Sequence, residues 1–310
     1  MPQVSVVIPA YNSELFLKQT INSVLAQTFT GWELLVVDDG SKDGTASLVQ
    51  EYAGRDGRIR LLQQENSGVA GALNHGFACI SPDSIYLSIL GHDDIWKPDM
   101  LQTLIAAVER APLCVGAYGN AQYIDSKGDK FKSGEFEKFH SGRREIVNKR
   151  VVLSYLDKPT NFKMLACFNC IPASGVVVRR AIMDRVNLFD PKCVGAEDWD
   201  LWLRMSLLGD FCFVDQVVYS YRIHETNMSK NREFMMKAEH TMLSNLINSN
   251  LLTTSQKQAL RIGYKYRQWT EIVKLRSKWA RESFARRQFL NAAKQICHLL
   301  FDYIRVHRKF

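Results

Sequence analysis

The stretch VSVVIPAYN, residues 4–12, determines how the rest of the chain is interpreted. Its first five residues form a β-branched, nearly continuous apolar run, which is typical of a strand buried on both faces of a sheet. Pro9 cannot donate a hydrogen bond to a neighbouring strand, so we expect the strand to stop there. Leu17, Ile21 and Val24 then recur at helical spacing. The chain therefore opens with a predicted strand–helix unit.

The same unit repeats along the amino-terminal third of the chain. Further strands are predicted at 32–37, 59–62 and 85–90, with helices at 45–53 and 68–80 between them. Strand and helix alternating at roughly thirty residues per unit indicate βαβ crossovers. We therefore predict an α/β fold with a mainly parallel sheet flanked by helices.

Beyond residue 97 the pattern is less regular. We predict helices at 98–110 and 197–208, and strands at 115–118, 122–124, 175–178 and 217–223, the first two of them paired. Residues 126–168 are polar and rich in Lys and follow no clear pattern. From about residue 232 the pattern is helical to the end. We therefore predict an α/β domain at 1–230 and a basic, amphipathic helical C-terminal region at 231–310.

The composition of the 310 residues is that of a soluble globular protein, with 46% hydrophobic and 23% charged residues. No apolar run approaches the ~18 residues of a membrane span, and the first residues lack the basic and apolar pattern of a secretion signal. The cysteines are scattered and odd in number, which indicates reduced thiols rather than a disulfide framework. These observations predict a cytoplasmic protein.

The net charge of +8 is concentrated in the tail. Residues 261–310 contain 13 Lys and Arg and 3 Asp and Glu, a balance of +10, which leaves −2 for residues 1–260. Aromatic side chains such as Trp269, Trp279 and Phe284 are interleaved with these cations. A helix of this composition can lie in the interface of an anionic membrane. Its apolar side chains can equally pack on the rest of the protein or on a second subunit, as in a homodimer, so both interpretations stay open.

Two adjacent carboxylates, Asp93 and Asp94, follow the predicted strand at 85–90 in the segment LGHDDIW. Carboxylates at the end of a buried strand must be paired, ligated or solvated. A hard divalent cation that also binds phosphate oxygens would meet that requirement. On the dipeptide alone, a solvated turn before the helix that includes Pro98 is the simpler interpretation.

Convergence with other polar groups favours a functional site. Polar residues follow three predicted strands, at 9–12, 38–41 and 92–94. Because the carboxyl ends of parallel strands lie at one edge of a sheet, these groups should meet in one crevice. There a tyrosine ring can stack on a flat base, and a carboxylate can accept from an imide N–H. Residues 66–68, at a predicted helix start, offer backbone N–H groups to an anion.

These motifs resemble those of glycosyltransferase family 2. The similarity is carried by residues 4–12, by 23–28, by DDGSKDGT at 38–45, by DDIWKP at 93–98 and by EDWDLW at 197–202, and it spans roughly residues 3–225. The resemblance implies the GT-A fold and an enzyme that transfers a sugar from a nucleotide sugar with Mg²⁺ or Mn²⁺, inverting the anomeric carbon. It also implies a bacterial surface-polysaccharide type of enzyme, which makes lipopolysaccharide or capsule.

By position, the resemblance assigns roles at the expected site. The nucleotide-binding residues would be Pro9, Ala10, Tyr11, Asn12, Glu14, Asp39, Ser67, Gly68, Asn74 and Asp93. The metal ligands would be Asp93, Asp94 and His224. The base that deprotonates the acceptor hydroxyl would be Asp198, with Glu197 and Trp199 on the acceptor side. Without the resemblance, Asp198 would be interpreted as a helix cap.

One departure from the family pattern affects the metal. Gly91 stands where the D-x-D motif has its first aspartate, so that the segment is GHDD. Metal affinity is then weaker, or His92 substitutes as a ligand, and a catalytically inactive family member is a serious alternative. The chemistry otherwise agrees with transfer, because a cation neutralises the departing diphosphate and a carboxylate must take the proton of a poorly nucleophilic hydroxyl.

Two other functions account for fewer of these sequence features. A sugar nucleotidyltransferase needs a Gly-rich phosphate loop after the first strand, where this chain has PAYN, and P-loop and G-x-G-x-x-G patterns are absent. A nucleic-acid-binding protein with a basic tail leaves the polar strand ends unexplained, so no nucleic acid partner is expected. We predict an inverting glycosyltransferase that uses a nucleotide-sugar donor, by resemblance a UDP-sugar, and a glycan or polyprenol-linked acceptor at the inner face of the membrane. No motif sets the donor sugar, the acceptor or the linkage.

Overall fold

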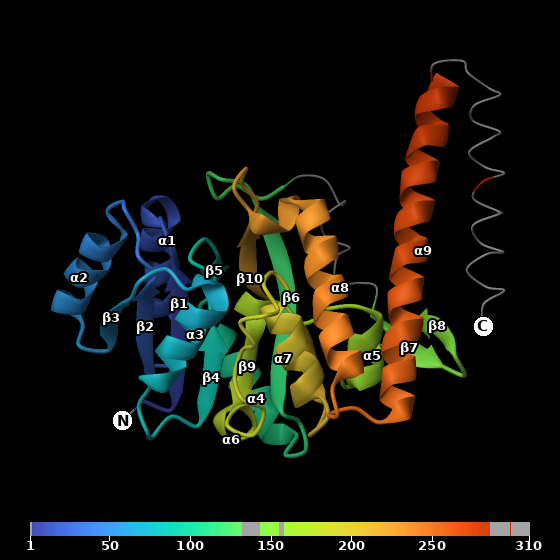
Figure 1. The fold of residues 1–310 in the computed structure, drawn as a ribbon. Coiled ribbons are helices and arrows are strands. Elements are labelled where there is room, and N and C mark those ends of the chain that lie inside the picture. Colours follow the sequence, from blue (N-terminus) through green and yellow to red (C-terminus); the bar gives the residue numbers. More distant parts are fainter. Residues whose placement is uncertain (1, 132–142, 155–157, 286–297, 299–310) are drawn as a thin grey trace.

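The computed structural model describes residues 2–131, 143–154, 158–285 and 298. Its centre is an eight-stranded sheet with the strand order β3-β2-β1-β4-β9-β6-β10-β5 (Figure 1). In chain order these strands are β1 (Val4–Ala10), β2 (Trp32–Asp38), β3 (Ile59–Gln63), β4 (Tyr86–Ile89), β5 (Ile95–Trp96), β6 (Gly116–Ile124), β9 (Val176–Arg179) and β10 (Phe211–Arg222). Strands β7 (Arg144–Val147) and β8 (Arg150–Leu153) form a separate hairpin.

The helices connect and cover these strands. They are α1 (Glu14–Leu25), α2 (Thr45–Arg55), α3 (Gly68–Ala78), α4 (Met100–Arg110), α5 (Phe162–Cys167), α6 (Arg180–Met183), α7 (Glu197–Met205), α8 (Arg232–Asn248) and α9 (Thr254–Ala285). Short 3-10 turns lie at Ala173–Gly175 and Met228–Lys230. The predicted alternation of strand and helix over the first ninety residues is confirmed.

The sheet is mainly parallel, as predicted. Strands β3, β2, β1 and β4 run parallel to one another, and β6 runs parallel to β10. Strand β9 is antiparallel to both of its neighbours, and the short β5 is antiparallel to β10. The ends of β1, β2 and β4 therefore lie at one edge, which is where the polar residues were expected to meet.

Two details of the central region differ from the prediction. Residues 115–118 and 122–124 do not pair with each other, because they belong to the single strand β6. Strand β10 begins at Phe211 and not at 217, and the register with β6 shifts on either side of Val217. An irregularity of this kind interrupts the alternation of side chains, which hides a long strand from a pattern search.

The buried strands separate two hydrophobic cores. In β1, Val7 belongs to one core and its neighbours Val6 and Ile8 belong to the other. Helices α1, α2 and α4 cover the second core, and α3, α5, α7, α8 and α9 contribute to the first. Strand β1 is thus buried on both faces, as the nearly continuous apolar run in residues 4–8 predicts.

The C-terminal helices share the first of these cores. Ala259, Leu260 and Ile262 of α9 are buried against it, as are Met242 and Leu243 of α8. At Gly263 a Cβ atom would overlap with the carbonyl oxygen of Ala166, so that α9 and α5 approach backbone to backbone. Beyond this contact α9 extends well past the body of the molecule (Figure 1). No helix in the described part of the chain has the length and apolar character needed to span a membrane.

Candidate active site

The loops after β1 and β2 are joined by side chains of the expected nucleotide site. Asn12 has a left-handed φ of +49°, a conformation in which Asn is enriched. Its backbone N–H donates to Ser41 Oγ at 2.9 Å, and its Oδ1 accepts from the N–H of Lys42 at 2.8 Å. Glu14 accepts from the backbone N–H of Gly44 at 2.9 Å. Asn12 and Glu14 thus shape the two loops that border the site.

Pro9 and Ala10 are the last residues of β1, and Tyr11 follows them at the start of the loop. Ala10 is 1% exposed, and its carbonyl accepts from the N–H of Asp39 at 2.8 Å. Pro9 is half-buried in the register of β1 with β2. The side chain of Tyr11 is 48% exposed, so that its ring is available to a ligand. This is the placement expected of a tyrosine that stacks on a base.

The carboxylate of Asp39 is bound to the start of α3. It accepts from the backbone N–H of Ser67 at 2.8 Å and from that of Gly68 at 2.9 Å. The side-chain amide of Gln64, which the sequence did not single out, also donates to it at 2.7 Å. The N–H groups expected to bind an anion therefore already bind Asp39. The hydroxyl of Ser67 is a fourth donor, at 3.4 Å. Because a carboxylate has about four acceptor positions, the N–H of a base would have to share an oxygen of Asp39 with these donors or replace one of them.

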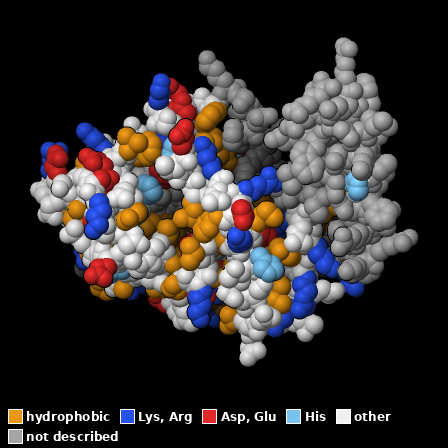
Figure 2. Space-filling view, turned by 45° about the horizontal axis from the view of Figure 1, so that its top comes forward, with side chains coloured by type: hydrophobic (Ala, Val, Ile, Leu, Met, Phe, Trp, Pro, Cys, Tyr) orange, Lys and Arg blue, Asp and Glu red, His pale blue; other side chains and the backbone are white. Residues whose placement is uncertain are grey.

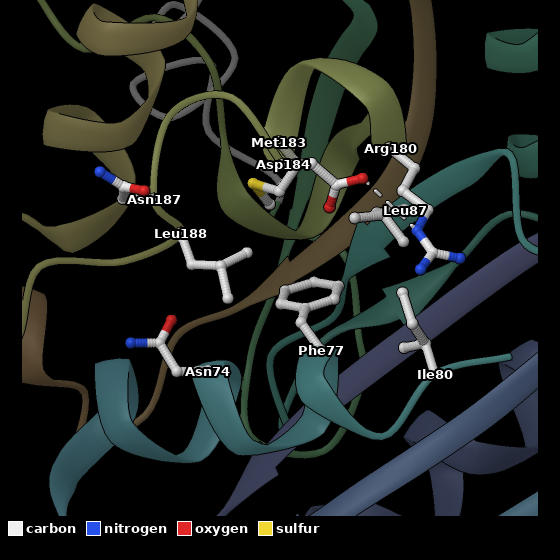
Figure 3. A pocket seen from close by; sticks show the side chains of 9 residues that line it. All are labelled: Asn74, Phe77, Ile80, Leu87, Arg180, Met183, Asp184, Asn187 and Leu188. Atoms are coloured by element: carbon white, nitrogen blue, oxygen red, sulfur yellow. Dashed lines mark ion pairs between the residues drawn. The ribbon is translucent and has the colours of Figure 1, made fainter. Parts of the chain in front are cut away.

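Asn74 faces a different part of the molecule from the one expected. Its side-chain amide both donates to the carbonyl of Phe189, at 2.9 Å, and accepts from the N–H of Phe189, at 3.0 Å. It borders a pocket of about 430 Å³ between α3 and α6 (Figure 3), lined by both polar and apolar side chains near the start of β4. Asp93 lies beyond the other end of β4, so this pocket is separate from the expected metal ligands.

Asp93 and His224 form the central contact of the site. His224 Nε2 lies 2.9 Å from Asp93 Oδ2, and both side chains are mostly buried. His224 Nδ1 lies 2.8 Å from the hydroxyl of Thr226, and the amide of Asn227 lies within 3.4 Å of Asp93 Oδ2. Since an ionised carboxylate only accepts, the Nε2–H of His224 would donate to Asp93, and Nδ1 would accept from the hydroxyl of Thr226. Residues 131 positions apart are thus brought together as a carboxylate–imidazole pair.

Asp94 points away from this pair. It is 3% exposed, and its two oxygens accept from Ser174 Oγ at 2.5 Å and from the N–H of Arg222 at 3.0 Å. Burial, and then the adjacent charge of Asp93, raise the pKa of Asp94 well above its ordinary value. This placement differs from the expected metal ligand, because both oxygens already have partners inside the protein.

The packing around Asp94 also explains why residue 91 is a glycine. Its N–H donates to Ser174 Oγ at 3.0 Å. A Cβ at this position would lie 3.0 Å from Asp93 Oδ1 and 3.3 Å from Asp94 Oδ2, tighter than ordinary contact. A third carboxylate here would therefore crowd and repel the other two.

Arg222 binds the backbone of the loop that carries Asp93 and was not anticipated from the sequence. It is fully buried, and its Nε donates to the backbone carbonyl of Asp93 at 2.8 Å. Its other nitrogens donate to Gln19 at 2.5 Å and to the carbonyl of Ser126 at 3.1 Å. A buried guanidinium needs such a set of acceptors. Because its partners are far away in the chain, no local motif reveals it.

Asp198 lies at the start of α7 in a desolvated environment. Asn169 donates to its Oδ2 at 3.1 Å, and the N–H of Trp199 donates to its Oδ1 at 2.7 Å. Burial raises the pKa of Asp198 from its ordinary 3.8 to about 6; the Asn169 hydrogen bond opposes this shift, and the charge of Glu197 adds to it. A carboxyl with a pKa near 6 is ionised at neutral pH and can accept a proton.

The two neighbours of Asp198 lie deeper than expected for acceptor contacts. Glu197 is 9% exposed, and burial raises its pKa. Trp199 is 6% exposed, and its indole N–H donates to the carbonyl of Leu165 at 2.9 Å. Both side chains therefore lie behind the surface of the site and do not form part of that surface.

Two tyrosines of β10 lie within electrostatic range of the carboxyls after β4 and of Asp198. The pKa of Tyr221, raised to about 12 chiefly by burial, is also raised by the charges of Asp94, Asp93 and Asp198. Tyr219, the next residue but one on β10, likewise senses Asp94 and Asp198. The charges of Asp94 and Asp198 thus act on the same two tyrosines, although the two carboxyls are about a hundred residues apart in the chain.

Residues 5–168 match the sequence profile described as Glycosyl transferase family 2. The chain belongs to glycosyltransferase family 2. It is therefore a glycosyltransferase, and it resembles WfgD of Escherichia coli, a UDP-Glc:alpha-D-GlcNAc-diphosphoundecaprenol beta-1,3-glucosyltransferase, with 30% identity over 253 residues, covering 80% of this chain and 88% of that protein. Chondroitin synthase of Escherichia coli is 25% identical over 276 residues, which is 89% of this chain and 36% of the synthase.

Solved structures confirm the GT-A fold. Staphylococcus aureus TarS 1–349, in complex with UDP-GlcNAc, superimposes with a TM-score of 0.62 at 18% identity, covering 99% of this chain and 81% of that one. The mannosyltransferase PcManGT of Pyrobaculum calidifontis, in complex with GDP-Man and Mn²⁺, gives a TM-score of 0.61 at 16% identity, covering 97% and 88%. At these identities the comparison establishes the fold alone.

Proposed function

We propose that this glycosyltransferase inverts the anomeric carbon as it moves a sugar from a UDP-sugar to a polyprenol-linked glycan, with Asp198 as the general base. The observation that carries the proposal is the mostly buried contact of 2.9 Å between Asp93 and His224 after β4, together with the carboxylate of Asp198 that Asn169 holds at the start of α7. A single displacement requires a group that binds the cation and a group that accepts the proton of the acceptor hydroxyl. A displacement in one step inverts the reacting carbon.

The donor half of the site follows from the loops after β1 and β2. Tyr11 offers an exposed ring for the base, and Asp39 offers an acceptor for a base N–H. Asn12 and Glu14 hold the bordering loops in place. WfgD is named for UDP-Glc, and TarS was crystallised with UDP-GlcNAc, which supports UDP for this chain.

The residues after β4 and β10 fit a divalent cation. Asp93 and His224 would hold it, and Thr226 would orient the imidazole, as partners of metal-bound histidines do. Among the described residues no three His, Cys, Asp or Glu side chains gather into a metal cluster, so substrate phosphates and water would complete the shell. When bound, the cation neutralises charge on the departing diphosphate. An imidazole ligand favours a transition metal such as Mn²⁺ over Mg²⁺.

The acceptor half centres on Asp198. Asn169 directs its amide at the carboxylate and leaves the other acceptor positions of Asp198 for a sugar hydroxyl. The raised pKa makes the ionised carboxylate a better base than an exposed aspartate while keeping it charged at pH 7. The lipid-linked acceptor in the name of WfgD supports an acceptor of the same class here.

A donor-hydrolysis screen tests this function without knowledge of the acceptor. UDP-, GDP- and dTDP-sugars are incubated with the full chain and Mn²⁺, Mg²⁺ or chelator, and release of nucleoside diphosphate is measured. We expect slow hydrolysis of a UDP-sugar that needs a cation and is lost in Asp93→Asn. Binding of UDP-sugar with no turnover under any condition would instead support the catalytically inactive member, and turnover in chelator would exclude the cation.

We also propose that residues 261–310 contact an anionic membrane surface, where a polyprenol-linked acceptor would be met. The net charge of +10 in this segment and the extension of α9 beyond the body support this. Over the face shown in Figure 2, basic and acidic side chains of the described residues are interspersed and form no single basic patch.

A further inference from the structure

Arg267 of α9 is buried at the junction of four helices. It is 9% exposed, and its Nη1 donates to the carbonyls of Ala166 at 2.7 Å and Cys167 at 2.6 Å, the last residues of α5. Its Nε donates to Glu239 of α8 at 2.6 Å. The centre of its guanidinium lies 4.6 Å from the ring of Trp199 in α7. One side chain from the C-terminal region thus contacts α5, α7 and α8 at once.

These contacts are more specific than surface packing. Burial lowers the pKa of Arg267, and the charge of Glu239 opposes this shift. A buried cation is retained only where acceptors fix it, and the last carbonyls of a helix are natural acceptors for a cation. The planar fork of arginine can bind two adjacent carbonyls and stack on an indole together, which a lysine cannot do. The C-terminal end of α5 is therefore held by Arg267.

The same end of α5 leads directly to the base. Two residues after Cys167, Asn169 donates to Asp198 Oδ2 at 3.1 Å. Asn169 Oδ1 is buried and has no hydrogen-bond partner among the described residues. The orientation of this amide therefore depends on where the backbone after α5 is placed. On the other side, Trp199, which Arg267 stacks on, is the residue next to Asp198.

We propose that Arg267 is a positioning residue for Asp198, acting through the end of α5 and Asn169 and through Trp199, so that the docked helices α8 and α9 complete the acceptor side of the site. The inference rests on the proposed role of Asp198 as the base. It makes the C-terminal region a structural part of the active site as well as a candidate membrane contact.

The test measures the titration of Asp198 and does not require turnover. The carboxyl carbon of Asp198 is followed by NMR against pH in labelled full-length chain and is assigned by its absence in Asp198→Asn. The charged and titratable groups that face it are Glu197 on its own helix and Tyr219 and Tyr221 from β10. None of these is changed in the variants compared.

Asn169→Ala should raise the Asp198 pKa by about one pH unit, because a hydrogen bond to the charged form is lost. Arg267→Lys should shift the Asp198 pKa in the same direction, because the amide of Asn169 is then no longer held in place. Arg261→Lys is the matched control on the same helix, where the side chain is exposed, and it should leave the titration unchanged. Should Arg267→Lys fail to fold, Glu239→Gln removes the charge that holds Arg267, and a smaller shift of the same sign is expected.

Transfer kinetics provide the second measurement. In Arg267→Lys the acidic limb of the kcat/KM profile should move to higher pH with the donor Kd unchanged. An unaltered Asp198 titration in both Arg267→Lys and Glu239→Gln overturns the inference even if the wild type transfers sugar. If the variants shift the Asp198 titration but the wild type transfers no sugar, the positioning role is kept and the proposed function is rejected.

Discussion

Replacing Asp198 by Asn should reduce catalysis and stabilise the fold at the same time. Asparagine keeps the shape of the side chain and still accepts from the N–H of Trp199, but it cannot take a proton. Loss of a general base lowers rates by roughly 10²–10⁴-fold. Because the side chain faces the acceptor, the affinity for the donor should stay within about twofold, a change of less than ~0.5 kcal/mol.

The stability effect follows from the pKa of Asp198. The folded protein holds this proton up to a pH of about 6 and the unfolded chain up to about 3.8, so the carboxyl contributes stability below pH 4 that is lost as the pH rises through 6. Two pKa units correspond to about 3 kcal/mol. Partial solvation of the half-buried group reduces this, so we expect Asp198→Asn to gain about 1–3 kcal/mol at pH 7 and little at pH 4.

Urea unfolding at pH 4 and pH 7, together with transfer rates and donor binding, checks both effects. Asp184→Asn is the control, since Asp184 is exposed and remote from the site, and it should change neither quantity. A variant that loses stability at pH 7 and loses donor affinity, while its transfer rate per bound donor is retained, would show that Asp198 is a helix cap and that the assignment as a base is wrong.

Three further outcomes are expected. Asp93→Asn should bind Mn²⁺ at least tenfold more weakly in calorimetry and lose donor turnover while its melting curve is retained, and chelation of the wild type should do the same; activity of the variant in chelator would contradict this. Gly263→Ala should destabilise the chain by about 1–3 kcal/mol in urea, because the new methyl group meets the carbonyl of Ala166; unchanged stability would mean that α9 is not docked as described. Removal of the residues after Ala285 should weaken cosedimentation with anionic vesicles, in a salt-dependent way, without unfolding the protein, whereas equal binding to neutral vesicles would exclude an electrostatic membrane contact.

The elements that could be predicted are those whose signal is local. The strand at 4–8 is recognisable because four of its five residues are apolar and β-branched, which fits a position between two cores, and Val6 and Val7 do enter different cores. The parallel direction of the strands then follows from the βαβ crossovers, so that their carboxyl ends lie at one edge of the sheet. From these two facts alone, the loops that carry Tyr11, Asp39 and Asp93 can be placed together.

The details of the site could not be predicted, because they depend on contacts between distant residues. Asp93 and Asp94 are chemically identical neighbours, yet only Asp93 meets His224, while Asp94 turns inward to Ser174. Which of the two faces the site is decided by strand β10, more than a hundred residues later. Arg222 is invisible to a motif search for the same reason, since its role is to bind backbone carbonyls that any sequence supplies.

The number of basic residues in the C-terminal region does not tell how many of them can contact a membrane. Arg267 is one of the 13 basic residues between 261 and 310, yet it is buried against α5 and cannot contact lipid. A truncation near Thr253 would remove Ala259, Leu260 and Arg267 from the core, so loss of membrane binding in such a variant would report unfolding. Each cation near an anionic surface contributes about 1 kcal/mol. Any membrane attachment must therefore come from cations that the core does not use, which restricts the proposal to the side of α9 that faces away from α5 and to the residues after it.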